Sequence, residues 1–296
     1  MSGFPLIAVL LWSGNAIVSK LAAASLAPAT IAFYRCLLAW LLLTPWLARP
    51  LWQQRHALRP YLGKLCLLAL LGMVLNQTLG YYAAQQVSAV NMGIHNALIP
   101  LITVLLSLWL LKEGPTLGAL FGTLISLFGL VWLLGEGHPA HLLAQGIGQG
   151  DLLMLLAVFS YALYGVLFKR WALPLSGWQF VYLQMTAALI WLLPDFLRVG
   201  QWQLAAVQLP LILYAAIPAT LLGSWCWLEG VRRLGANRTA IYMNLLPLFT
   251  AVIAVLLLGE RLAGFHLVGG GLTLAGVILC QLWRQPLRQP PLPAAA

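Results

Sequence analysis

The apolar residues of this 296-residue chain are grouped in ten long runs, and charges, prolines or glycines separate one run from the next. A hydrocarbon core about 30 Å thick needs about 20 helical residues to cross it. The runs show no alternation of period two, and a helix satisfies its own backbone hydrogen bonds in lipid. The pattern therefore predicts an all-α polytopic membrane protein with ten transmembrane helices. They are expected near residues 4–21, 30–48, 62–84, 91–111, 116–135, 151–169, 178–196, 209–230, 238–258 and 264–283.

The composition excludes a soluble protein. Apolar residues make up 62% of the chain and charged residues only 7%, whereas soluble domains carry about 25% charged residues. A soluble protein of this size could not hide so much apolar surface, so the surrounding solvent must be a bilayer.

The net charge of +10 reports orientation in the membrane. With the N-terminus in the cytoplasm, most of the sixteen Lys and Arg residues fall in cytoplasmic segments, and Lys20, Arg198 and Arg261 fall outside. This positive-inside bias predicts that both termini are cytoplasmic. The basic side chains are expected to contact anionic lipids rather than nucleic acid.

The sequence contains an internal repeat of two similar copies. A shift of 149 residues places Lys20 on Lys169, and a shift of 147 places Pro100 on Pro247. The second shift aligns NALIPLITVLLSLWLLKE with MNLLPLFTAVIAVLLLGE without a gap. Five spans per copy is an odd number, so the second copy must enter the membrane inverted. Inverted repeats recur in secondary transporters, which bind substrate between the halves.

The repeat divides the chain into parts. Residues 1–135 form the first five-helix repeat, 136–150 a periplasmic connector and 151–283 the second, inverted repeat. Residues 284–296 are rich in proline and are expected to be a disordered cytoplasmic tail.

Several ordered motifs resemble the EamA family of the drug/metabolite transporter superfamily. They are WSGNAIVSK, FYRCLLA, the two aligned proline segments, and the glycine-spaced GALFGTLISLFGLVWLL and LVGGGLTLAGVIL. The resemblance extends over nearly the whole chain. It implies a carrier of the bacterial inner membrane, often an exporter of amino acids or related small metabolites, with a central cavity between the halves. Asn15 and Gly14 become Tyr164 and Leu163 in the second copy, which predicts a chemically asymmetric cavity.

Polar and aromatic residues within the spans are the candidate substrate contacts. Trp12, Asn15 and Ser19 share one helical face. An amide facing lipid is costly, so Asn15 must face a neighbouring helix or a wet cavity. His95 and Tyr242 occupy equivalent places in the two copies; a hydrogen-bonded structural role for His95 stays open. The predicted substrate-binding residues are Trp12, Asn15, Ser19, Asn76, Tyr81, His95, Asn96, Tyr161, Tyr164, Trp225, Trp227, Tyr242 and Asn244.

A second group is expected to act in gating or structure: Arg35, Pro100, Pro247, Glu113 and Glu260. Arg35 would anchor its span or pair near the outer gate. The prolines can kink helices and expose carbonyls. Glu113 and Glu260 are expected to favour the N-terminus of the helix that follows each of them. Lys20 is expected to reach headgroups or the outer gate.

No spacing typical of a catalytic, metal or cofactor site is found. With the inverted repeat, the aromatic residues of the spans and the family resemblance, this predicts a secondary transporter without cofactor. It would act by alternating access on amino acids or related small and in part aromatic metabolites. An intramembrane enzyme acting on lipids or isoprenoids and a non-transporting scaffold remain alternatives. Either a monomer or a weak homodimer is compatible with the glycine spacing, because glycines can pack helices within one chain.

Overall fold

The computed structural model describes residues 3–111, 116–140, 147–234, 242–283 and 285. Helices joined by short loops make up nearly all of this part of the chain. The elements up to residue 134 are α1 (Phe4–Ala22), α2 (Pro28–Gln53), α3 (Arg55–Leu58), η1 (Arg59–Tyr61), α4 (Leu62–Ala69), η2 (Leu70–Leu75), α5 (Asn76–Ala83), α6 (Ala89–Asn96), α7 (Ile99–Leu110) and α8 (Leu117–Leu134). The later ones are α10 (Gln149–Trp171), α11 (Gly177–Val199), η3 (Ala206–Gln208), α12 (Leu209–Tyr214), η4 (Ala215–Leu222), α13 (Gly223–Leu234), η5 (Tyr242–Leu245), α15 (Leu246–Leu258) and α16 (Gly264–Leu282).

The helices confirm a membrane protein with many spans. In the described residues, 7 helical stretches are long and apolar enough to cross a bilayer. Shorter apolar helices at Leu120–Leu134, Tyr242–Leu258 and Gly264–Leu279 lie within three further predicted runs. Large apolar side chains such as Leu124, Leu256 and Leu267 are more than half exposed, as expected for surfaces that face lipid rather than water.

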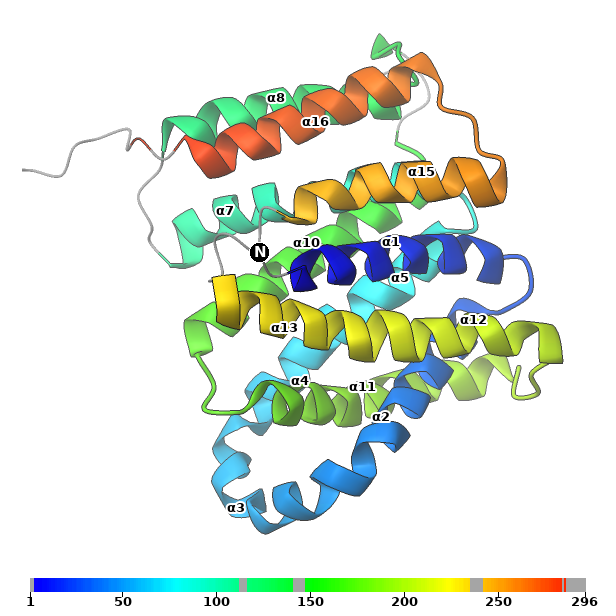
Figure 1. Cartoon of the computed structure of the whole chain (residues 1–296), viewed down its shortest axis with the longest axis vertical. Helices are drawn as coiled ribbons and strands as arrows, with labels where there is room; N and C mark the ends of the chain where they lie inside the picture. The colour runs from blue at the N-terminus through cyan, green and yellow to red at the C-terminus, as the bar shows by residue number, and fades with distance from the viewer. Residues whose placement is uncertain (1–2, 112–115, 141–146, 235–241, 284, 286–296) are drawn as a thin grey trace, which may run out of the picture.

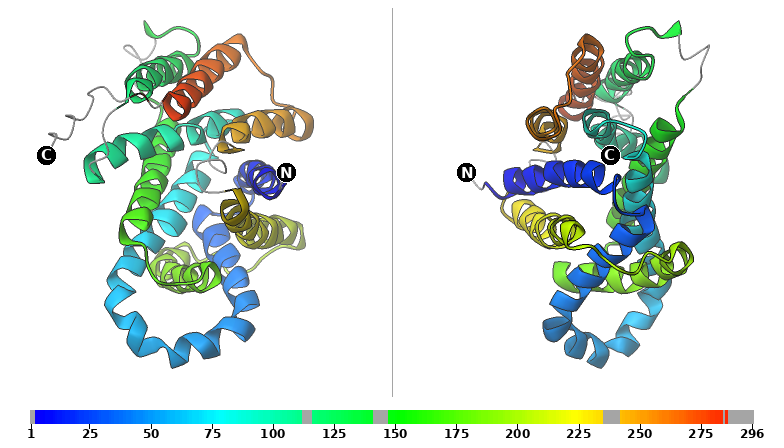
Figure 2. Two further views of the ribbon diagram at one scale, coloured as in Figure 1. Left: turned by 60° about the vertical axis from the view of Figure 1, so that its left-hand side comes forward. Right: turned by 90° about the vertical axis from the view of Figure 1, so that its right-hand side faces the viewer.

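The arrangement places the ends of the two halves together. α8 and α16 lie side by side at one end of the molecule, and the arc of α2, α3 and α4 closes the other end (Figures 1 and 2). Between them α1 packs against α13 and α15, while α10 packs against α5 and α7. α2 packs against α11. Helices of the first half therefore contact mainly helices of the second half.

Glycines allow α8 and α16 to approach backbone to backbone. A Cβ built on Gly129 would lie 2.7 Å from the carbonyl oxygen of Gly269, and one on Gly269 would lie 2.8 Å from that of Gly129. Ser126 Oγ donates to the carbonyl of Thr273 at 2.9 Å across the same contact. The glycine spacing of these two spans thus packs helices within one chain.

Two long helical stretches contain π-helical segments. η2 interrupts the stretch Arg55–Ala83, and η4 interrupts Ala206–Trp227. Pro218 lies inside η4 and lacks the N–H that an α-helical turn requires, which favours a wider turn there. Shifting Leu70–Leu75 by 147 residues gives positions 217–222, which fall inside η4. Such segments are rare and occur frequently at functional sites.

Pro100 and Pro247 begin helices rather than bending continuous ones. The chain leaves α6 after Asn96, and α7 starts at Ile99 with Pro100 as its second residue. In the other half η5 precedes α15, in which Pro247 is again the second residue. A proline is tolerated at this place because the first N–H groups of a helix have no partner within the helix. The expected kink is therefore a break between two helices.

Candidate functional site

Trp12 and Trp227 lie together beside the π-helical segment η4. The Trp12 indole Nε1 donates to the carbonyl of Ala219 at 2.9 Å, and its ring lies 5.3 Å from that of Trp227. Trp225 faces elsewhere: it is 38% exposed and meets Phe4 edge to face at 5.5 Å. Of the three predicted tryptophans, the structure thus brings two into contact.

Asn15 and Ser19 remain on α1 without reaching another helix through a described hydrogen bond. Ser19 is buried, and its hydroxyl donates to the carbonyl of Asn15 at 2.8 Å within the helix. The side-chain oxygen of Asn15 is buried and has no hydrogen-bond partner among the described residues. Buried polar atoms are normally hydrogen-bonded. The Asn15 oxygen can therefore accept a hydrogen bond from a ligand or a water molecule.

Lys20 is held by the protein rather than reaching outward. Its Nζ donates to the carbonyls of Ala84 and Val87, at 3.0 and 2.9 Å. These carbonyls lie where α5 ends and the loop to α6 begins. The ammonium therefore links α1 to this loop rather than to lipid headgroups, and the alternative of a role at the outer gate stays a prediction.

Arg35 lies at the centre of a buried polar cluster that joins α2, α5 and η4. Nη1 donates to Gln77 Oε1 at 2.6 Å and to the Tyr81 hydroxyl at 2.9 Å. Nη2 donates to the Thr220 hydroxyl at 2.5 Å. Asn76, next along α5, donates to the carbonyl of Ala157 on α10 at 2.9 Å. The side chain thus connects both halves of the chain. The sequence-based prediction placed Tyr81 and Asn76 among the substrate contacts and assigned Arg35 to gating or structure.

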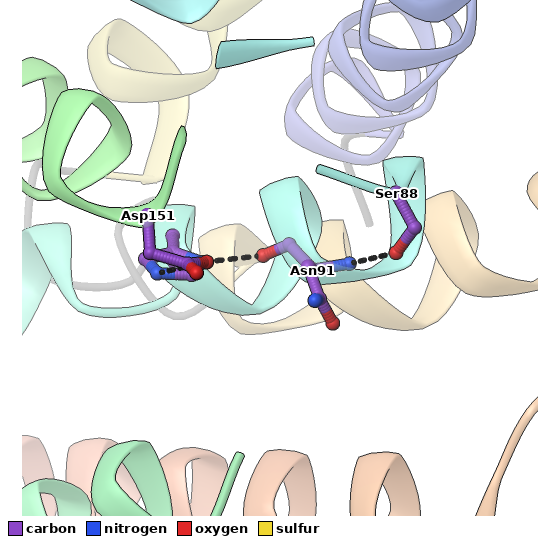
Figure 3. A network of polar contacts seen from close by, with 4 residues as sticks. Ser88, Asn91 and Asp151 are labelled. Carbon is purple, nitrogen blue, oxygen red and sulfur yellow. Dashed lines mark hydrogen bonds and ion pairs between the residues drawn. The ribbon is translucent and has the colours of Figure 1, made fainter. Parts of the chain in front are cut away.

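His95 forms a pair with Asp151 that the sequence did not predict. The His95 side chain is fully buried, and Nε2 lies 3.5 Å from Asp151 Oδ1. Ser88, Asn91 and Asp151 belong to one row of polar contacts (Figure 3). His95 Nδ1 lies 2.8 Å from the carbonyl of Asn91, which can only accept, so Nδ1 must carry a proton. Nε2 and the carboxylate therefore attract each other only when one of them is also protonated.

The aromatic residues of α10 form a second cluster. Tyr161 and Tyr164 lie 5.4 Å apart. The Tyr164 ring packs so closely on η2 that a Cβ on Gly72 would lie 2.8 Å from it. Its hydroxyl lies 3.4 Å from Gln184 Oε1, and Gln184 is the repeat counterpart of Arg35. The two halves thus place different chemistry at equivalent positions.

The remaining predicted residues sit where helices are interrupted. Asn96 ends α6 and is half-buried, whereas Tyr242 and Asn244 lie in η5. Asn244 is buried. These positions put amide and phenol groups beside backbone that leaves regular α-helical geometry.

The acidic residue Glu260 caps a helix other than the expected one. Its carboxylate accepts from the N–H groups of Ala89 and Val90, at 2.8 and 3.1 Å. These groups begin α6 in the first half, whereas the prediction assigned Glu260 to the helix that follows it. The prediction was wrong because local sequence cannot reveal which helix N-terminus is nearest in space. Glu113, its counterpart, lies outside the described residues.

Several site residues were missed because their partners are distant in sequence. Asp151 was read as the edge of a loop, yet it contacts His95, which is 56 positions earlier. Thr220, which was also missed, binds Arg35 from a different helix than Gln77 does. The only available signal was that polar residues are unusual inside apolar spans.

Comparison with known proteins identifies the family. The profile of the EamA-like transporter family matches residues 3–135 and residues 148–281. The chain belongs to the EamA-like transporter family. An uncharacterized transporter of Archaeoglobus fulgidus is 30% identical to this EamA-family protein, over 92% of this chain and 93% of its own. The aromatic amino acid exporter YddG of Salmonella typhimurium is 24% identical, over 68% of this chain and 70% of its own.

The fold is also similar to a solved one. A crystal structure superimposes with a TM-score of 0.60 at 18% identity, covering 94% of this EamA-family chain and 95% of the other. The family profile and the relatives, rather than this likeness of fold, confirm the sequence-based recognition of the family and a general role in transport across a membrane.

Proposed function

We propose that this EamA-family protein is a secondary transporter, an exporter or facilitator that moves amino acids or related small metabolites, including aromatic ones, by alternating access. The packing of the halves carries the proposal. α1 contacts α13 and α15, and its counterpart α10 contacts the counterparts of these helices, α5 and α7. This exchange of equivalent contacts is what two inverted five-helix repeats related by a pseudo-twofold axis would produce.

Two further observations support ten spans in two inverted repeats. The family profile matches the chain in two segments of similar length, close to the proposed repeats 1–135 and 151–283. The π-helical segments η2 and η4 occupy overlapping positions after the repeat shift. We place residues 136–150 in a periplasmic connector and residues 284–296 in a cytoplasmic tail.

The site we propose lies along the contact between the halves. Trp12 and Trp227 provide aromatic faces, and Tyr161 and Tyr164 provide a second aromatic pair. Asn15 contributes an amide oxygen with no described partner. Aromatic faces combined with amides suit small amphipathic solutes, whose rings stack while their polar ends find hydrogen bonds. The activity for which one relative, YddG, is named, aromatic amino acid export, agrees with this chemistry.

The setting we propose is the bacterial inner membrane, with both termini in the cytoplasm. The basic residues of the cytoplasmic segments would contact anionic lipids. The protein would act on a small-molecule substrate without nucleic acid or cofactor, and not as an enzyme. The close glycine contact of α8 and α16 is made within one chain, which favours a monomer over a homodimer built on these glycines.

Counterflow in liposomes tests the proposal. Purified protein is reconstituted into vesicles loaded with one unlabelled amino acid, and uptake of the same labelled compound is followed for an aromatic, aliphatic, basic and acidic panel. At least one compound should accumulate transiently and saturably, and protein-free vesicles should show none. The variant Trp12→Ala should weaken uptake of that compound, whereas Trp46→Ala should not, because Trp46 is 71% exposed on α2.

A monodisperse, folded protein that exchanges no member of the panel would refute transport of this class. Conversion of a labelled lipid or metabolite by the same preparation would instead indicate an enzyme.

A further inference from the structure

The guanidinium of Arg35 is a buried cation that the described part of the protein leaves electrically uncompensated. The residue is only 7% exposed and lies in a membrane-spanning helix. Its three hydrogen bonds all go to neutral groups, the side chains of Gln77, Tyr81 and Thr220. Neutral dipoles stabilise a buried charge less than an opposite charge does.

The acidic residues in the described ranges are placed elsewhere. Asp195 pairs with Arg198, Glu229 with Arg233, Asp151 with His95, and Glu260 caps α6, while Glu136 follows α8 in a turn. None of these five is within ion-pair distance of Arg35. An ionisable residue inside a membrane segment is rare and by default marks a functional site. The missing negative charge therefore points to a ligand.

The donor inventory of Arg35 fits a carboxylate. A guanidinium has five N–H groups, and the described residues accept three hydrogen bonds from it, two from Nη1 and one from Nη2. The Nε–H and one Nη2–H remain available. Neighbouring N–H groups of a guanidinium bind the two oxygens of a carboxylate as a fork, which a lysine ammonium cannot do.

The surroundings indicate what the rest of the ligand is like. Thr220, which binds Arg35, directly follows Ala219, whose carbonyl accepts from Trp12. Trp12 in turn lies against Trp227. An aromatic pair and a guanidinium thus converge on one π-helical segment, η4. The repeat counterpart of Arg35 is the neutral Gln184, so only one half of the protein offers this charge.

We propose that Arg35 binds the carboxylate of a small metabolite whose apolar or aromatic body lies toward Trp12 and Trp227. This inference rests on the proposed transport function and specifies its substrate class. Arg35 is then a substrate-binding residue rather than only an anchor of α2.

Three related compounds separate the carboxylate from the rest of the ligand: phenylalanine, 3-phenylpropanoate, which lacks the amine, and 2-phenylethylamine, which lacks the carboxylate. Binding is measured on purified protein by quenching of tryptophan fluorescence. Uptake is measured in phosphatidylcholine vesicles, whose lipid has no carboxylate and no net charge. The native protein should bind the two carboxylates at least tenfold more tightly than the amine.

Two variants test Arg35, so that the test still stands if one of the variant proteins does not fold. Arg35→Gln copies the neutral residue of the other half and should weaken binding of both carboxylates at least tenfold, with no change for the amine. Gln77→Glu keeps the shape of the side chain and places a carboxylate 2.6 Å from Nη1. This variant should keep or raise the melting temperature while weakening carboxylate binding at least tenfold, because Arg35 is then neutralised from within.

Three results would overturn the inference, and a fourth would refute transport instead. The inference is overturned when a folded Gln77→Glu protein binds the carboxylates as the native protein does, when Arg35→Gln weakens amine and carboxylates equally, or when the native protein binds no carboxylate of the wider amino-acid panel. Carboxylate binding in solution without uptake into vesicles would instead refute transport while leaving the Arg35 site intact.

Discussion

The crossing of α8 and α16 offers a sharp test of the structure, because two glycines in these helices have opposite surroundings. A Cβ on Gly129 would lie 2.7 Å from both the Gly269 oxygen and the Thr273 nitrogen. A Cβ on Gly271, in α16, would meet nothing within 4 Å. We therefore compare Gly129→Ala with Gly271→Ala, which adds the same methyl group to a helix.

The magnitudes follow from these distances. A contact of 2.7 Å is about 0.8 Å shorter than the roughly 3.5 Å separation at which nonbonded carbon atoms attract most. The two backbones must move apart, and overpacking of this kind costs about 1–3 kcal/mol. Replacing a helical glycine by alanine otherwise stabilises by about 0.5–1 kcal/mol. The two variants should thus differ by about 2 kcal/mol in the free energy of unfolding.

Thermal unfolding in detergent, followed by size-exclusion chromatography with fluorescence detection, measures the difference. For a chain of this size 1 kcal/mol corresponds to about 2 °C or more. Gly129→Ala should therefore melt at least ~4 °C below Gly271→Ala, which should equal or exceed the native protein. Equal melting temperatures of the two variants would show that α8 and α16 do not cross at Gly129.

Two polar side chains that bind the backbone of another segment give further predictions. Glu260→Gln removes the charge that caps α6 through Ala89 and Val90; it should cost about 1 kcal/mol and lower the melting temperature. The adjacent exposed Arg261→Gln should not, and equal effects would contradict the cap. Lys20→Met removes two charge-assisted hydrogen bonds to the loop after α5 and should cost about 1.5–3 kcal/mol, seen as faster proteolysis at that loop; unchanged cleavage would contradict it.

The positions of the helices could be predicted from the sequence because the bilayer fixes how long an apolar run must be. The two aligned segments around Pro100 and Pro247 also end up in equivalent elements, as the start of α7 and of α15. The prediction of where the helices lie is robust because it depends on hydrophobicity averaged over about 20 residues.

The contacts of single polar residues could not be predicted in the same way. Glu260 lies near the helix that follows it in sequence but caps α6, which is 170 positions away. Trp225 and Trp227 are two residues apart and therefore point to different sides of α13, so only Trp227 meets Trp12. Such pairings depend on how helices cross, which a pattern of apolar runs does not encode.

The π-helical segments have a consequence for how substitutions in this protein should be designed. One residue of an α-helix corresponds to about 100° of rotation. Because η2 accommodates a wider turn, everything after it on the same stretch, including Gln77 and Tyr81, is turned relative to an uninterrupted helix. Removing a single residue from Leu70–Leu75 would leave an apolar span of nearly the same length, yet it would swing the partners of Arg35 away from it. In this stretch the rotation of residues about the helix axis decides which side chains face the neighbouring helix. The identity of any one apolar side chain matters less.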